Sequence, residues 1–372
     1  MMVRLSRAEQ QELNRRKVLT AAREEFAEHG FHGTTVDGIA VRAELTRGAV
    51  YSNFPSKRAV YFAVLADEAE RAPSATQKPP GITVEGALEL FAAISIDPLP
   101  RSSDYVYQGM LQLRSPMLGI DLIPELMSDE SLRGPFAQLI KFDAILLGMA
   151  LEALATANGS VPRRWINTAE CVLTMLYGST QLSFVAPGFT SIANILTVCS
   201  HMPTAGLEER EWAPPEGMST LDVAEVDESW DPPQALDIVR GTSARLEVDG
   251  VVAIFGVDRL TAVEALVRVQ PPAGHLTVVI VVGDTAELSA LARLTIADLT
   301  RSLRSAFPET TWPRFDVVVD ETRTVATACG IGTMDNDTEA AVRISRGRIT
   351  SRVLGPLAGH SLTSIAVPSP FR

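Results

Sequence analysis

The 372-residue sequence has few cysteines and histidines and lacks a long apolar run. The three cysteines lie far apart, at Cys171, Cys199 and Cys329. An odd and scattered set excludes a disulfide framework and the paired spacing of a zinc site. His201, His275 and His360 lie far apart as well, with no carboxylate at ligand spacing. We therefore expect no metal site and no cofactor, and a reducing environment.

No uninterrupted apolar run is long enough to span a bilayer. Residues 1–11 include Arg4, Arg7 and Glu9 and lack the apolar centre of a signal peptide. The expected location is therefore the cytoplasm.

Positive charge is scarce, with a formal net charge of −12, but it is unevenly distributed. Residues 1–60 contain ten Lys and Arg against seven Asp and Glu, a net charge of +3, whereas the rest contains 23 against 38, a net charge of −15. A basic end on an acidic chain fits contact with nucleic acid through that end only.

The most informative stretch is residues 31–58, whose pattern is typical of a helix-turn-helix. Thr34 is expected to cap a short helix, with Asp37 completing a capping box. A turn at 43–45 follows, and Thr46 caps a second helix that ends near Phe54. Pro55 then stops this helix and Ser56 caps the next one.

The second helix of this stretch has one apolar face and one polar face. Val50 and Phe54, four residues apart, are expected to point into the core, and Gly48 is expected to let two backbones approach closely. The opposite face, which a major groove can accept, consists of Arg47, Ala49, Tyr51, Ser52 and Asn53.

Together with residues 21–30, this stretch closely resembles the DNA-binding domain of the tetracycline-repressor (TetR) family. The chain keeps the pattern at Phe26, Gly30, Thr34-Thr35-Val36, Ile39-Ala40, Gly48, Tyr51, Phe54 and Ser56-Lys57. It departs at Glu44-Leu45, where Gly-Val is usual, and at Thr46, where Ser is usual. The resemblance implies an all-α DNA-binding domain over residues 1–72.

Exposed helix faces and helix N-termini meet a duplex first, which predicts the DNA contacts. Sequence reading is expected from Arg47, Ser52 and Asn53. Phosphate contacts are expected from Thr34, Thr35, Tyr51 and Lys57. Thr46 and Ala49 complete the predicted set. Arg15-Arg16-Lys17 either touch phosphate or form a solvated face.

Residues 73–204 read as helical and apolar after a proline-rich joint. Helices are expected at 84–94, 104–113, 122–127, 135–157, 164–185 and 190–199. The resemblance implies a ligand-binding and dimerisation domain, with the longest helices, 135–157 and 164–185, pairing with those of a second copy. The candidate ligand residues, each also explained as core, are Phe91, Tyr107, Met110, Phe142, Met149, Met175 and Tyr177.

Residues 205–235 are acidic and rich in proline, which predicts a linker that cannot bury a core. Trp212 and Trp230 are unusual in a free linker, so parts of it are expected to dock on a domain.

Residues 236–372 alternate strand-like and helix-like segments and end in a hairpin at 346–348, which predicts a mixed α/β sheet. This order resembles the thioredoxin-like fold, nearest its thiol-disulfide oxidoreductase and peroxiredoxin-like branches. It departs from that fold where the redox Cys-x-x-Cys would stand, because residues 256–262 contain no cysteine. A lone Cys329 lacks a second sulfur that could resolve a mixed disulfide.

We therefore expect a redox-inactive binding or interaction module that folds alone, with a groove near Asp258, Arg259 and Leu260 for a ligand or partner. For the whole chain we expect a non-enzymatic, homodimeric repressor of the TetR type. It would bind a pseudo-palindromic operator in double-stranded DNA and leave it when a small-molecule effector binds. Two alternatives remain: a thiol-dependent redox enzyme or sensor that uses Cys329, and an extra dimerisation module.

Overall fold

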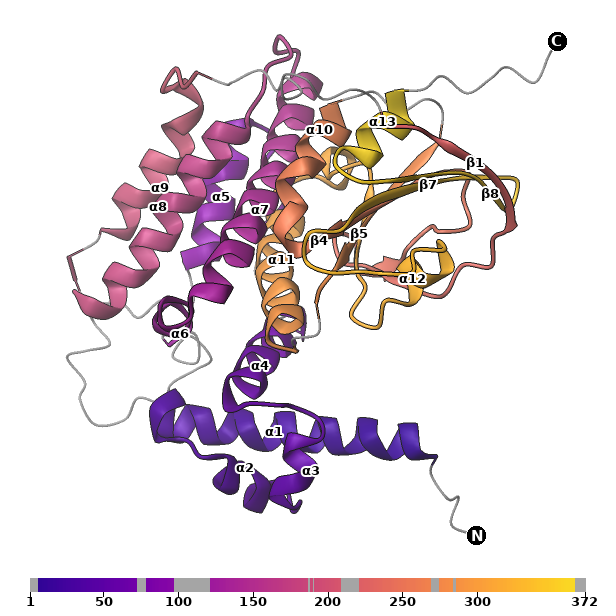
Figure 1. The fold of residues 1–372 in the computed structure, drawn as a ribbon. Coiled ribbons are helices and arrows are strands. Elements are labelled where there is room, and N and C mark those ends of the chain that lie inside the picture. Colours follow the sequence, from indigo (N-terminus) through magenta and orange to yellow (C-terminus); the bar gives the residue numbers. More distant parts are fainter. Residues whose placement is uncertain are drawn as a thin grey trace, which may run out of the picture.

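The computed structural model describes residues 6–71, 78–96, 121–186, 188–189, 191–208, 221–268, 274–283 and 286–364. Figure 1 shows three parts: a small helical head, a bundle of longer helices that we call the body, and a mixed sheet with helices that we call the α/β part. In the part of the chain that is described, no helix is long and apolar enough to cross a membrane.

The head consists of α1 (Arg7–Gly33), α2 (Val36–Arg42), α3 (Arg47–Tyr51) and α4 (Lys57–Arg71). Gly30 interrupts α1 with a φ of 67°, a conformation that glycine adopts without strain, so this residue ends the regular part of the helix. The aromatic rings of Phe26, Phe31 and Tyr61 pack together, with centroids 5.0 to 6.1 Å apart. They fasten α4 to α1.

The body consists of α5 (Val84–Ile96), α6 (Leu122–Ser128), α7 (Glu130–Ala157), α8 (Ile166–Val185) and α9 (Ile192–His201). These helices match five of the predicted ones, and the helix predicted at 104–113 lies outside the described residues. The start of α7 differs from the prediction. Asp129 caps it by accepting a hydrogen bond from Ser131 N (3.0 Å), so Pro135 lies within the helix and not at its first position.

The α/β part contains a six-stranded sheet in the order β1-β8-β7-β4-β5-β6. Its strands are β1 (Ala224–Ser229), β4 (Gly250–Gly256), β5 (His275–Val281), β6 (Asp316–Val319), β7 (Glu339–Ser345) and β8 (Arg348–Leu354). Strands β4, β5 and β6 are parallel, and β7 and β8 are antiparallel to their neighbours, which confirms a mixed sheet. Arg346 and Gly347 both have positive φ, as a two-residue hairpin turn requires.

In the body, the 3-10 helix η3 (Met202–Thr204) directly follows α9. The remaining elements of the α/β part are the 3-10 helices η4 (Val257–Ala262) and η5 (Glu309–Thr311), the short strands β2 (Leu236–Asp237) and β3 (Thr242–Ser243), and the helices α10 (Val263–Arg268), α11 (Ala286–Ala306), α12 (Thr324–Ala328) and α13 (Ala358–Ser364).

Strand β1 lies inside the segment 205–235 that was predicted to be a linker, and for residues 224–229 that prediction is wrong. The strand pairs with β8, and its acidic side chains meet arginines there: Glu228 lies 2.6 Å from Arg352, and Asp227 pairs with Arg348. The predicted docking of Trp230 is confirmed, because its ring is buried and its Nε1 donates to Leu246 O (2.8 Å).

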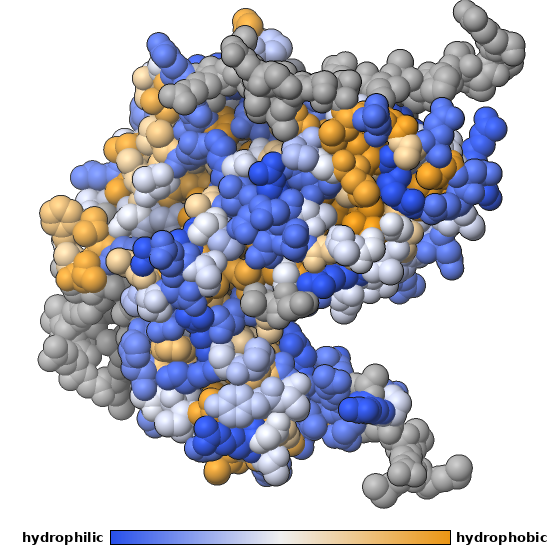
Figure 2. Space-filling model, viewed as in Figure 1, coloured by the Kyte–Doolittle hydropathy of each residue, from blue (hydrophilic) through white to orange (hydrophobic). Residues whose placement is uncertain are grey.

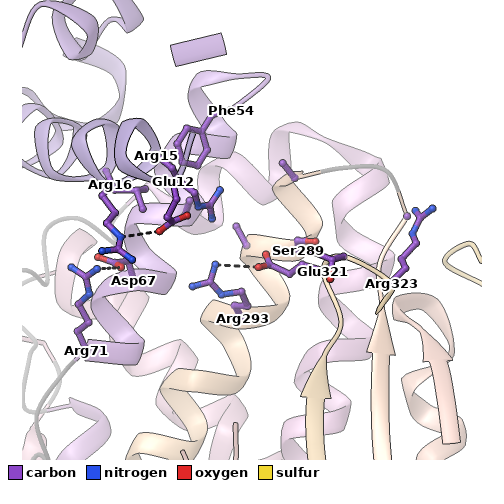
Figure 3. Close-up of a pocket in the computed structure, with 16 residues that line it drawn as sticks. Glu12, Arg15, Arg16, Phe54, Asp67, Arg71, Ser289, Arg293, Glu321 and Arg323 are labelled. Atoms are coloured by element: carbon purple, nitrogen blue, oxygen red, sulfur yellow. Dashed lines mark hydrogen bonds and ion pairs between the residues drawn. The ribbon is translucent and has the colours of Figure 1, made fainter. Parts of the chain in front are cut away.

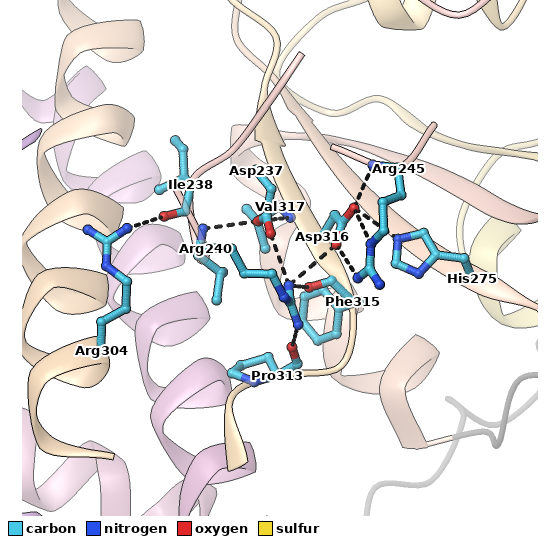
Figure 4. A network of polar contacts seen from close by, with 11 residues as sticks. Asp237, Ile238, Arg240, Arg245, His275, Arg304, Pro313, Phe315, Asp316 and Val317 are labelled. Atoms are coloured by element: carbon cyan, nitrogen blue, oxygen red, sulfur yellow. Dashed lines mark hydrogen bonds and ion pairs between the residues drawn. The ribbon is translucent and has the colours of Figure 1, made fainter. Parts of the chain in front are cut away.

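Asp316, the first residue of β6, is only 1% exposed and lies at the centre of a polar network (Figure 4). It accepts hydrogen bonds from Arg245 N (2.8 Å) and Arg245 Nη2 (2.7 Å). Arg240 Nη1 lies 3.3 Å from its Oδ1, and His275 Nε2 lies 3.0 Å from its Oδ2. Burial by itself raises the pKa of Asp316, but the contacts with His275 and Arg245 outweigh it and lower the pKa. The network fastens residues 236–245 to the sheet.

Helix α11 leaves the sheet and packs against α4, α5 and α7 (Figure 1). Arg293 forms an ion pair with Glu70 of α4 (2.5 Å), and Phe307, directly after α11, packs its ring against Phe91 of α5, with centroids 6.4 Å apart. A single apolar core therefore runs from the head through the body into the α/β part. This packing argues against the expectation that residues 236–372 fold alone.

Candidate nucleic-acid interface

Helices α2 and α3 lie on the side of α1 that faces away from the body (Figure 1). Thr35 caps α2 by accepting from Gly38 N (3.0 Å), and Thr46 caps α3 by accepting from Ala49 N (3.2 Å). In the turn between them, Glu44 has a φ of 56°. A left-handed residue here explains why glycine is usual at this position of the motif.

The prediction that Thr34 caps α2 is wrong. Its side chain is 2% exposed, and its hydroxyl donates to the carbonyl oxygens of Glu25 (3.0 Å) and Gly30 (2.8 Å). Because Thr35 is the cap, the predicted capping box between Thr34 and Asp37 does not form. Because the Thr34 hydroxyl is buried and bonded to these carbonyl oxygens, it cannot reach a phosphate. Its bonds instead stabilise the C-terminal end of α1.

Arg47 projects from the first turn of α3 with its side chain well exposed. Its Cζ lies 5.4 Å from the centroid of the Tyr51 ring, and its Nη1 lies 3.3 Å from Asp37 Oδ2. A hydrogen bond to the Tyr51 hydroxyl and the charge of Asp37 raise the pKa of Arg47, so the guanidinium stays charged. An exposed ion pair of this kind is weak, so Arg47 can exchange Asp37 for a base or a phosphate.

The other predicted residues of this surface differ in how accessible they are. Thr35, Thr46, Tyr51 and Ser52 are exposed, and Ala49 and Asn53 are half-buried. Ser52 Oγ and Asn53 Nδ2 both donate to Ala49 O, at 2.9 and 2.8 Å. These bonds close the last turn of α3, so the single O–H of Ser52 must rotate before it can donate to a base.

Lys57, at the start of α4, is half-buried. Its Nζ donates to Phe31 O (2.7 Å) and Thr34 O (3.2 Å) and lies 4.2 Å from the centroid of the Phe31 ring. Lys57 therefore ties α4 to the end of α1. An ammonium has three N–H donors, so one remains for a phosphate.

The sequence did not predict that two further residues, Gly48 and Val41, are exposed on this surface. Gly48 is exposed, and a Cβ at this position would meet only Thr46 Oγ1, at 3.9 Å. The predicted close backbone approach is therefore wrong, and Gly48 leaves the surface of α3 open. Val41 of α2 is 80% exposed, although it follows Ile39-Ala40 and reads as part of the same apolar face. An exposed valine here can contact a thymine methyl group.

Arg42 fixes the position of α2 on α1. It donates to both carboxylate oxygens of Glu28, at 2.8 and 2.7 Å, and lies 3.2 Å from Glu24 and 2.8 Å from Glu25. Two-pronged bonding of this type defines orientation as well as distance. The surface formed by α2 and α3 is thus held rigidly on the long first helix.

The described members of the predicted ligand set belong to the packed core. Phe91 and Phe142 are buried, and Met149, Met175 and Tyr177 are half-buried and packed against the same core. Tyr107 and Met110 lie outside the described residues. The structure therefore brings five of the seven side chains into one helical body.

The predicted groove at Asp258, Arg259 and Leu260 is covered. Leu260 is buried, and α7 packs against η4, where Thr261 N donates to Gln138 Oε1 (2.9 Å). Cys329 is buried as well, and burial raises the pKa of its thiol to about 12. A thiol that is buried and protonated is a poor nucleophile, so this residue has the properties of a structural cysteine.

Comparison with known proteins agrees with this geometry. Residues 18–64 match the family described as "Bacterial regulatory proteins, tetR family". Over 115 residues the chain is 34% identical to the uncharacterized HTH-type transcriptional regulator TtgW of Pseudomonas putida, covering 29% of this chain and 84% of TtgW. The chain belongs to the TetR family. It is therefore a DNA-binding transcriptional regulator, and α1 to α4 form its helix-turn-helix domain.

Other TetR relatives match in part. The HTH-type transcriptional regulator SrpR of Pseudomonas putida is 34% identical over 115 residues, and the chain spans about half of its length (53%). A solved TetR transcriptional regulator from Rhodococcus sp. RHA1 is 18% identical, covers 54% of this chain and 99% of its own, and has a TM-score of 0.32. A TM-score this low adds nothing to the family assignment.

Proposed function

We propose that this TetR-family regulator is a homodimeric repressor that binds a pseudo-palindromic operator in double-stranded DNA and leaves it when a small-molecule effector binds. The observation that carries the proposal is the exposed surface of α3, where Arg47 lies charged over Tyr51. This helix has only five residues. Because one short recognition helix makes few base contacts, two heads in successive major grooves are needed for useful affinity.

An exposed apolar strip supports the proposed dimer. It lies on α8, on α9 and between them, at the left edge of the molecule in Figure 2, and consists of Leu182, Val185, Phe189, Ile192 and Val198. Apolar surface of this kind on one face is typical of a protein–protein contact. Helix α7, which was also expected to pair with a second copy, is buried between α8, α11 and η4 over most of its length. We therefore place the dimer contact on α8 and α9.

The proposed effector site is in the body, where a buried carboxyl group lies among apolar helices. Asp143 of α7 is 2% exposed, and its Oδ1 has no hydrogen-bond partner among the described residues. Burial, followed by the charge of Asp298, raises the pKa of Asp143. Burial, followed by the charge of Asp143, raises the pKa of Tyr177, a member of the predicted ligand set. An effector with a hydrogen-bond donor would satisfy this oxygen.

For the α/β part we propose a thioredoxin-like arrangement without catalytic activity, in a protein of the cytoplasm. The sheet order β8-β7-β4-β5, with a parallel pair next to an antiparallel hairpin, supports this assignment. The burial of Cys329 and its raised pKa argue against the alternative of a thiol-dependent enzyme or sensor.

Selection of bound duplexes from a random pool by the purified full chain tests this function. We expect an enriched inverted repeat whose half-sites are about one helical turn apart. Sedimentation of the free protein should give the mass of a dimer. An enriched sequence without two-fold symmetry, or no enrichment at all, would contradict the proposal.

A further inference from the structure

Arg47 of α3 and Asp37 of α2 form an ion pair on the surface of the head that faces away from the body. Nη1 of Arg47 lies 3.3 Å from Oδ2 of Asp37, and the two side chains are 60% and 66% exposed. A duplex that contacts α3 therefore meets an arginine and a carboxylate side by side. The carboxylate requires an explanation, because the phosphates of DNA repel it.

Other ion pairs of the head face the α/β part. Arg16 pairs with Glu12 on α1, and both side chains line a cavity between α1, α4 and α11 (Figure 3). This cavity lies on the body side of α1, whereas α2 and α3 lie on the opposite side (Figure 1). The Arg47–Asp37 pair is thus placed to contact the duplex, and the Arg16–Glu12 pair is not.

Tyr51, one turn after Arg47 on α3, orients the guanidinium. The Cζ atom of Arg47 lies 5.4 Å from the centroid of the Tyr51 ring, and its Nη2 donates to the Tyr51 hydroxyl (3.5 Å). A guanidinium has five N–H donors, and the contacts with Tyr51 and Asp37 take two of them. Three donors therefore remain for a base, on a side chain that is already held in one orientation.

The remaining donors of Arg47 fit a guanine. In the major groove, guanine presents two acceptors, O6 and N7, and an arginine can donate to both. Adenine presents one acceptor beside a donor, thymine one acceptor beside a methyl group, and cytosine a donor. Arg47 should therefore prefer guanine to the other three bases.

Asp37 fits the cytosine that pairs with this guanine. An ionised carboxylate only accepts hydrogen bonds, and the N4 amino group of cytosine is a donor in the major groove. Guanine O6 and cytosine N4 are hydrogen-bonded to each other, so they lie about 3 Å apart. The nitrogen and oxygen of the Arg47–Asp37 pair have nearly the same separation, 3.3 Å, so they can bond O6 and N4 at the same time.

We infer that Arg47 and Asp37 together read one G·C base pair in the major groove, with Arg47 donating to the guanine and Asp37 accepting from N4 of the cytosine. Asp37 is then a specificity-determining residue. An A·T pair in the same register places the adenine amino group against Arg47 and the thymine O4 against Asp37, so like meets like at both positions. The inference requires only DNA contact by the head, and not the proposed dimer or effector.

Selection of duplexes from a random pool by the full-length wild type, Asp37→Ala and Glu44→Ala tests the inference. The wild-type motif should contain a position where G·C is preferred by about tenfold or more, and Asp37→Ala should lose most of this preference. Glu44→Ala is the matched control, because it removes an equal charge from the exposed turn between α2 and α3. It should keep the wild-type base preference at every position.

Base analogues at the same position separate the two contacts. Replacing the cytosine by 2-pyrimidinone removes the N4 amino group. This should weaken binding by the wild type and Glu44→Ala about fivefold more than binding by Asp37→Ala. The weaker base pairing affects all three proteins alike. Replacing the guanine by 7-deazaguanine removes N7, and should weaken binding by the wild type and Asp37→Ala but not by Arg47→Ala.

A wild-type motif without a position that requires G·C would overturn the inference, as would no enriched motif. An Asp37→Ala protein with the wild-type base preference would overturn it, and so would equal losses with 2-pyrimidinone in the wild type and Asp37→Ala. A purely structural role of Asp37 would change affinity for all duplexes alike. Asp37→Ser is a second variant with the same expected loss, because its side chain is too short to reach the cytosine. An enriched motif without two-fold symmetry contradicts the dimer only.

Discussion

Arg58 at the start of α4 and Glu287 at the start of α11 form an ion pair with nitrogen and oxygen 2.6 Å apart. The same guanidinium lies 2.6 Å from Asp129, the cap of α7, and the Arg58 side chain is only 22% exposed. Burial by itself lowers the pKa of Arg58, but bonds to Glu287 and Asp129 outweigh it and raise the pKa. One side chain thus joins the head, the body and the α/β part.

Arg58→Gln should lower the free energy of unfolding by roughly 1.5–3 kcal/mol, because it leaves two partly buried carboxylates without their cation. Arg348→Gln removes an exposed ion pair on the sheet edge and should cost at most about 1 kcal/mol. Urea unfolding of both variants measures the difference. Equal midpoints would show that the Arg58 contacts contribute no more than a surface ion pair.

Asp316→Asn should lower the free energy of unfolding by about 3 kcal/mol, because Arg240 and Arg245 lose the buried carboxylate that pairs with them. Asp227→Asn is the control, since the Asp227 side chain is mostly exposed. Urea unfolding measures the free energy of unfolding of both variants. A cost for Asp316→Asn as small as that for Asp227→Asn would mean that the network in Figure 4 does not hold residues 236–245 in place.

Acid should destabilise the protein through the same carboxylate. The pKa of Asp316 is lower in the folded protein than its ordinary value, so the folded state binds a proton less readily than the unfolded state. Its contribution to stability is therefore present above the unfolded pKa of about 3.9 and is lost as the pH falls toward the folded pKa. The free energy of unfolding should fall more steeply below pH 4 in the wild type than in Asp316→Asn. If the free energy of unfolding falls equally steeply with pH in both proteins, this prediction is wrong.

The fragment 236–372 should not fold as a stable unit, because the face of α11 that packs on α4, α5 and α7 would be exposed to water. The sequence alone had led to the opposite expectation. Circular dichroism and thermal unfolding of the fragment, compared with the full chain, measure this. A sharp cooperative transition in the fragment would restore the idea of an independent module.

Val185→Glu combined with Val198→Glu should produce monomers, because it places charge in the proposed α8–α9 contact. Val161→Glu is the matched control, since Val161 is 83% exposed and Val185 is 77% exposed, but Val161 lies outside this strip. Sedimentation velocity measures the mass of each. If the double variant remains a dimer, the contact lies elsewhere, for instance on the α/β part.

The sequence predicted local features of the fold well. The caps Thr46 and Ser56 are confirmed, since these depend on the placement of hydroxyl groups. Thr34 and Thr35 could not be told apart, because either hydroxyl fits a cap. The sequence did not predict β1, because a segment this acidic rarely forms a strand. The strand forms here because arginines of β8 lie opposite its acidic residues.

The docking of α11 on α4 depends on contacts between residues more than 200 positions apart, and no local pattern indicates these. One signal was present. Residues 59–66 of α4 are apolar on every side, not on one face only, and an all-round apolar helix is typical of burial.

The most direct test of the account is the affinity of the wild type and Arg47→Ala for the selected operator and for a scrambled duplex of equal length, at one salt concentration. The wild type should bind the operator at least about 1,000-fold more tightly than the scrambled duplex. Arg47→Ala should lose roughly 1–3 kcal/mol on the operator and much less on the scrambled duplex. Arg346→Ala should bind both duplexes with the same affinity as the wild type. Equal affinity of the wild type for both duplexes, or full operator preference in Arg47→Ala, would contradict the account.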